Sequence, residues 1–152
     1  MIRISSEAEL RQTFREIDRD QVFLPASFPF PLAIKNFKSW VEPSGHRVYL
    51  VFEDVQTQAR GIVFQRTAGS AEAAPAMCQW CNTVRGGSGV SLLTATASTN
   101  RRVGIHLCSD LNCGVGDNPA PSTNDLRESL SKAERMQRLM KRIQDFARNN
   151  LF

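Results

Sequence analysis

Long apolar runs are absent from this sequence of 152 residues. None approaches the ~18–20 residues that a membrane-spanning helix needs, and the opening segment, MIRISSEAELRQTF, lacks the apolar core of a secretory signal. We therefore expect a soluble, cytoplasmic protein with no membrane partner. Hydrophobic residues make up 41% of the chain, which is enough for a single domain over residues 1–152.

Residues and motifs typical of catalysis are also scarce. The chain has two histidines, His46 and His106, and it lacks a nucleophile elbow, a phosphate-binding P-loop and the H-E-x-x-H zinc-protease motif. The glycine-rich run at 86–89 follows a cysteine pair rather than a strand. It therefore predicts a turn with positive-φ positions instead of a phosphate cradle. These absences predict a protein that is not an enzyme.

Cysteine is confined to one part of the chain. Cys78 and Cys81 form a C-x2-C pair, and Cys108 and Cys113 form a C-x4-C pair, with 26 residues between the pairs. A reducing compartment disfavours disulfides, and two close pairs at this separation are typical of a tetrahedral zinc site. Four thiolates would fill the coordination shell. The spacing therefore predicts one structural Zn²⁺ that joins two distant pieces of chain.

Other interpretations of the cysteines remain open at this point. Buried cysteines serve as small hydrophobic residues, a C-x-x-C pair can be a thioredoxin-like redox motif between a strand and a helix, and cysteines also bind iron–sulfur clusters. His106 stands two residues before Cys108. It could replace one cysteine as a metal ligand, or it could be a strand residue beside the site.

Hydrophobic periodicity and capping signals predict an α+β fold. Ser6 with Glu9, and Ser131 with Glu134, are capping boxes that precede apolar stripes of helical spacing. Four apolar segments between them predict two antiparallel β-hairpins. The expected elements are a helix at 5–19, a proline-rich strap at 22–34, strands at 46–53, 59–67, 90–96 and 102–107, loops at 68–76 and 114–124, a zinc-finger subdomain at about 76–118, and a C-terminal helix at about 131–149.

The cysteine region resembles a known zinc finger. The run MCQWCNTVRGGSGVSLLTATASTNRRVGIHLCSDLNC has the C-x2-C pair followed by T-V-R, a V-x-L-x-T-A strand and the C-x-D-L-x-C ending. In these features it is similar to the treble-clef zinc finger of the elongation factor G-binding proteins, which include the fusidic-acid-resistance proteins of the FusB type. The tryptophan before E-P, the Y-L-V and G-I strands and the capped C-terminal helix extend the resemblance over residues 5–150.

The resemblance implies a function as well as a fold. Members of that family are not enzymes: they bind translation elongation factor G, and the resistance proteins help to release it from the ribosome when fusidic acid has trapped it there. The resemblance also implies that the four cysteines hold the zinc and that His106 is not a ligand. The full-length resistance proteins carry a helical bundle before this domain, whereas this sequence has one short predicted helix there.

Arginines provide candidate contacts to a partner. Arg85 lies in the predicted knuckle turn, and Arg101 and Arg102 lie in the following hairpin loop. If exposed together, they would steer association with an acidic protein such as elongation factor G. The arginines that flank the apolar stripe of the C-terminal helix are typical of a solvated face. An alternative function is a zinc-ribbon module that binds nucleic acid such as ribosomal RNA, and steep salt dependence would distinguish it.

Overall fold

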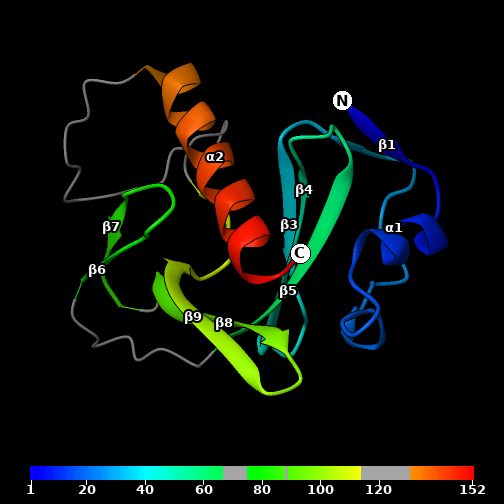
Figure 1. The fold of residues 1–152 in the computed structure, drawn as a ribbon, viewed down its shortest axis with the longest axis horizontal. Helices are drawn as coiled ribbons and strands as arrows, with labels where there is room; N and C mark the ends of the chain where they lie inside the picture. Colours follow the sequence, from blue (N-terminus) through cyan, green and yellow to red (C-terminus); the bar gives the residue numbers. More distant parts are fainter. Residues whose placement is uncertain (67–74, 88, 114–130) are drawn as a thin grey trace.

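A five-stranded antiparallel sheet lies at the centre of the protein, in a computed structural model that describes residues 1–66, 75–87, 89–113 and 131–152 (Figure 1). Two helices and two small two-stranded sheets surround it. The elements are β1 (Ile2–Ile4), α1 (Glu7–Thr13), a 3-10 turn (Arg19–Gln21), β2 (Leu32–Ile34), β3 (Phe37–Val41), β4 (Arg47–Glu53), β5 (Ala59–Arg66), β6 (Ala76–Met77), β7 (Val84–Arg85), β8 (Val90–Ser98), β9 (Arg101–Cys108) and α2 (Lys132–Asn150).

The strand order of the central sheet is β3-β4-β5-β8-β9. Both predicted hairpins are present, as β4–β5 and β8–β9, and the pairing of β5 with β8 joins them into one sheet. The predicted fold class, antiparallel hairpins with flanking N- and C-terminal helices, is therefore confirmed. Neither helix in the described part of the chain is long and apolar enough to cross a membrane.

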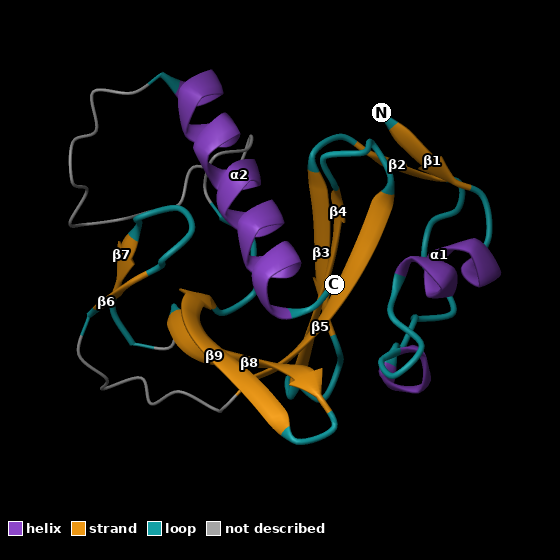
Figure 2. Cartoon of the chain, viewed as in Figure 1, coloured by secondary structure: helices purple, strands orange, loops and turns teal. Residues whose placement is uncertain are grey.

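The sheet has a hydrophobic core on each face, so β4 is buried on both sides. Val48, Leu50 and Phe52 face α2 and belong to the first core, whereas Tyr49 and Val51 face the N-terminal segment that contains α1 and belong to the second core. Side chains alternate along a strand, so one seven-residue strand contributes to both cores. Figure 2 shows the result: α2 and α1 lie on opposite sides of the sheet.

Helix α1 is shorter than the predicted helix at 5–19. Its start is as expected, since the Ser6 hydroxyl accepts a hydrogen bond from the Glu9 N–H at 3.3 Å. Its end comes early, because the backbone of Phe14 is extended and makes a parallel bridge to Gly61 on β5. The Phe14 ring is buried in the second core. Packing of this ring outweighs the helical pattern that continues through Ile17.

Helix α2 matches its prediction closely. The Ser131 hydroxyl accepts from the Glu134 N–H at 3.2 Å, and the helix runs from Lys132 to Asn150 with its apolar stripe buried against the sheet. The proline-rich strap also packs as expected, over the second core. The predicted loop at 114–124, most of the loop at 68–76, and residues 114–118 of the zinc-finger subdomain lie outside the described residues.

Candidate metal centre

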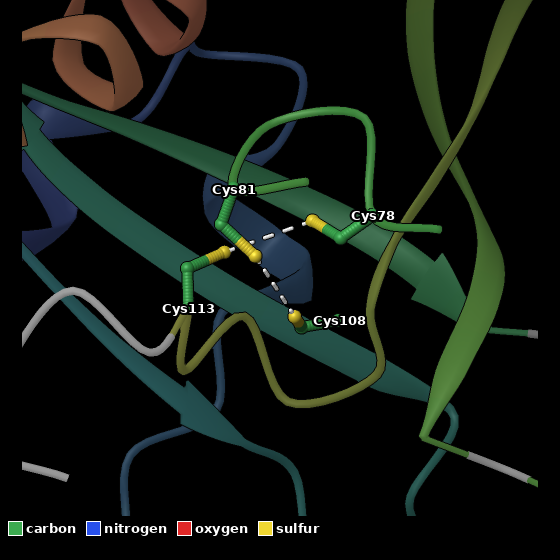
Figure 3. Close-up of side chains that lie close together, drawn as sticks. All are labelled: Cys78, Cys81, Cys108 and Cys113. Carbon is green, nitrogen blue, oxygen red and sulfur yellow. Dashed lines mark hydrogen bonds between the residues drawn. The ribbon is translucent and has the colours of Figure 1, made fainter. Parts of the chain in front are cut away.

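The four cysteine sulfurs converge on one point. Cys78 and Cys81 come from the turn between β6 and β7, Cys108 is the last residue of β9, and Cys113 follows it in the next turn (Figure 3). All four Sγ atoms lie within 4.8 Å of one another, and all four residues are buried. The structure thus brings together the two pairs that the sequence separates by 26 residues.

Each pair is shaped by a tight turn. In the first, the Cys78 N–H donates to the Thr83 carbonyl and the Asn82 N–H donates back to the Cys78 carbonyl, each at 2.9 Å. Asn82 has a φ of 62°, a left-handed conformation that asparagine tolerates. In the second, the Leu111 N–H donates to the Cys108 carbonyl at 2.9 Å. These turns aim the thiols of both pairs at a common centre.

The knuckle, defined here as residues 76–85, is fixed to the rest of the domain through Gln79 and Trp80. The Gln79 N–H donates to the carbonyl of His106 at 2.9 Å, and the His106 N–H donates to the Gln79 side chain at 3.0 Å. The buried Trp80 ring packs against Phe64 of β5 and Phe146 of α2, with centroids 5.9 and 5.8 Å away. The metal centre is therefore part of the first core.

Two of the distances between sulfurs match the edge length expected for a tetrahedral zinc ion. A Zn–S distance of about 2.3 Å places sulfurs about 3.8 Å apart in a tetrahedron. The Cys78–Cys113 and Cys81–Cys108 sulfurs are separated by 3.8 and 3.6 Å. A disulfide requires an S–S distance of about 2.05 Å, and none of the four cysteines forms a disulfide. The arrangement suits a metal ion and not a pair of disulfides.

Repulsion between the four close thiol groups, once they ionise, also favours binding of a cation at the centre of the cluster. Hydrogen bonding with Cys108 lowers the pKa values of the Cys78 and Cys81 thiols, and hydrogen bonding with Cys108 raises the pKa of Cys113 well above its ordinary range. Four buried thiols this close cannot all ionise without a counter-charge. A bound Zn²⁺ supplies that charge and leaves no open position for a substrate.

Comparison with known proteins agrees with this geometry. The family described as FBP C-terminal treble-clef zinc-finger matches residues 9–149. This chain belongs to that family. Membership, together with the four-sulfur cluster, confirms the predicted cofactor, one structural zinc ion held by Cys78, Cys81, Cys108 and Cys113. No curated protein matches the chain.

Among solved structures, the chain is similar to the fusidic acid resistance protein FusC. The TM-score is 0.53 at 17% sequence identity, over 72% of this chain and 50% of FusC. At this identity the likeness shows a shared fold. This chain spans about half the length of FusC.

His106 is not part of the sulfur cluster. Its side chain is exposed on β9, and the group of metal-ligating side chains found in the described residues consists of the four cysteines. The backbone of His106, however, holds Gln79 of the knuckle in place. The second of the two interpretations of His106, a strand residue beside the site, is the one that the structure supports.

The three candidate partner-binding arginines do not form one patch. Arg101 and Arg102 are exposed near the tip of the β8–β9 hairpin, where they are the first two residues of β9 and not part of the loop as predicted. Arg102 donates to the Gln65 side chain at 2.9 Å. Arg85 is half-buried on β7, next to the metal centre, which lies at the other end of β9. The eight residues of β9 span about 23 Å at ~3.3 Å per residue. The predicted arginine cluster therefore divides into a hairpin pair and a separate knuckle residue.

Sequence reasoning missed one residue at the site. From the sequence, Arg142 of α2 is predicted to be one of several arginines on a solvated side of the helix. In the structure its Nη1 donates to the carbonyls of Gln79 and Trp80 at 3.3 and 3.0 Å, and to the Asn82 side chain at 2.8 Å. The helical pattern distinguishes the buried from the outer side of α2, but it carries no signal for a contact with a turn 60 residues away.

Proposed function

We propose that this protein binds translation elongation factor G and modulates the interaction of that factor with the ribosome. The observation that carries the proposal is the family match over residues 9–149, with the complete four-cysteine centre gathered in space. The similarity to FusC, a fusidic acid resistance protein, supports it at the level of the fold.

We propose further that the protein acts by binding rather than by catalysis. A zinc ion with four thiolate ligands has no free position for water or substrate, and the buried centre is part of the hydrophobic core. Its contribution is rigidity: it fixes the knuckle and the β8–β9 hairpin relative to α2. Binding to a rigid surface can shift a partner between conformations when the surface fits one of them better.

Within this proposal, Arg101 and Arg102 steer the encounter. Both side chains are exposed on a hairpin tip that projects from the sheet (Figure 2). Exposed charges of one sign raise the association rate with an oppositely charged protein more than they raise affinity. Arg85 is the weaker candidate, because it is half-buried on β7.

The test is a binding titration of the zinc-loaded protein against purified elongation factor G from the same source. The same titration with a ribosomal RNA fragment compares the two partner classes, at a low and a high salt concentration. Saturable binding of elongation factor G that survives high salt is the expected result. Binding of RNA alone, with the steep salt dependence of phosphate contacts, would replace this function with the nucleic-acid alternative.

A further inference from the structure

The side chain of Arg142 donates hydrogen bonds to the knuckle that carries two of the zinc ligands. Arg142 lies in the middle of α2, and its Nη1 contacts three acceptors in the turn that carries Cys78 and Cys81. Two of these acceptors are the backbone carbonyls of Gln79 and Trp80, the residues between the two ligands. This contact joins the metal centre to a helix that supplies no ligand of its own.

The contact constrains the peptide units of the turn. In a planar trans peptide the C=O and the following N–H point in opposite directions. Because α2 holds the carbonyls of Gln79 and Trp80, the N–H groups of Trp80 and Cys81 point away from α2. Hydrogen bonds to a cation also polarise a peptide unit, which strengthens its N–H as a donor. Arg142 therefore fixes both the direction and the strength of two dipoles beside the ligands.

The charge of Arg142 is also complementary to the centre. Four thiolates and one Zn²⁺ carry a net charge of −2, and the guanidinium is a permanent positive charge on the adjoining turn. Residues that orient and polarise ligands from outside the coordination shell commonly change metal affinity by 10–100-fold. Arg148, which lies less than two turns further along the same helix, differs: it is exposed and pairs with Asp145 at 3.0 Å.

We propose that Arg142 is a positioning residue of the zinc centre, which couples zinc binding to the docking of α2. Through this contact the helix strengthens zinc binding, and zinc in turn strengthens the packing of the helix, since such coupling is reciprocal. This inference is independent of the partner, so it stands or falls separately from elongation factor G binding.

The experiment measures zinc affinity by competition with a chelator in the full-length variants Arg142→Gln, Arg142→Lys and Arg148→Gln. Arg148→Gln is the matched control, because it removes the same charge from the same helix. We expect Arg142→Gln to lower the zinc affinity by about 10–100-fold. Arg142→Lys, which keeps the charge, should lower it less, and Arg148→Gln should change it by less than about twofold. The Co²⁺-loaded Arg142→Gln variant should keep the absorption bands of four-thiolate coordination.

A second control separates positioning from simple loss of stability. Gly61→Ala, which crowds Phe14 on the opposite face of the sheet, lowers stability without contacting the knuckle. Asn82→Gly removes one Arg142 acceptor while keeping a left-handed backbone, and its effect should not add to that of Arg142→Gln. The proposal is overturned if Arg142→Gln weakens zinc binding no more than Arg148→Gln. It is also overturned if Gly61→Ala, at an equal loss of unfolding free energy, weakens zinc binding as much as Arg142→Gln does.

Discussion

A methyl group added at Gly61 should destabilise the protein, because Phe14 occupies the space above this glycine. An ideal Cβ at position 61 would lie 2.6–2.7 Å from three atoms of the Phe14 ring. Carbon atoms in contact prefer about 3.5–4.0 Å, so the ring must move by about 1 Å. Trp40 and Tyr49 hold it edge-to-face, with centroids 6.3 and 6.4 Å away.

Gly61→Ala should lower the free energy of unfolding by about 1–3 kcal/mol, the usual cost of overpacking a filled core. Urea unfolding of the zinc-loaded protein measures it. Gly86→Ala is the matched control, since among the described residues the nearest atom to a Cβ there, on Pro75, is 4.0 Å away. Its effect on the free energy of unfolding should stay within about 0.5 kcal/mol. A smaller side chain at position 14, as in Phe14→Leu, should make Gly61→Ala less costly. Equal stability of the two alanine variants would show that the Phe14 ring does not restrict the space at position 61.

Three further predictions concern the metal, the hairpin and a turn. Cys113→Ser should abolish stoichiometric zinc binding and lower the unfolding temperature, both measured against the parent protein; a variant that retains one tightly bound zinc would contradict the ligand assignment. The double variant Arg101→Glu/Arg102→Glu should slow association with elongation factor G about tenfold at low salt, whereas the exposed pair Lys35→Glu/Lys38→Glu, which makes the same change in charge, should slow it less. The Asp54 carboxylate accepts hydrogen bonds from the Gln56 and Gln58 N–H groups and from the Arg60 side chain, each at 2.9 Å. Partial burial acts to raise the pKa of Asp54, but these hydrogen bonds outweigh the burial and lower the pKa. A lowered folded-state pKa gives stability that is present above the unfolded value of about 3.9 and is lost as the pH falls. Asp54→Asn should therefore lower the free energy of unfolding by about 1 kcal/mol at pH 7 and by progressively less below about pH 4. Unfolding curves recorded across that pH range measure the difference, and a difference that does not change with pH would contradict the prediction.

Local signals in the sequence predicted most of the fold. The two hairpins and the capped helix α2 were predictable, because alternation, turn residues and capping boxes act over a few neighbouring positions. Strand β3 was missed because Phe37–Val41 mixes polar and apolar residues without strict alternation. Strand β1 was missed because three residues carry too little pattern. Both strands depend on partners elsewhere in the chain.

The metal centre was predictable from the spacing of its cysteines, but its surroundings were not. Two ligands in one turn leave a recognisable spacing, whereas the contact of Arg142 with that turn depends on how α2 packs on the sheet. The early end of α1 has the same origin, since Phe14 leaves the helix to pack on Gly61. The sequence placed the three arginines within a few residues of two turns, but it carried no signal that the length of β9 separates Arg101 and Arg102 from Arg85.

Native mass spectrometry of the protein, alone and mixed with elongation factor G from the same source, examines the zinc centre and the proposed partner together. One spectrum reports both the metal content and the complex. We expect one zinc per chain and a 1:1 complex. A chain that carries no metal, with cysteines open to alkylation in the folded state, would contradict the zinc centre. A zinc-loaded chain that forms no complex with the factor would contradict the proposed function.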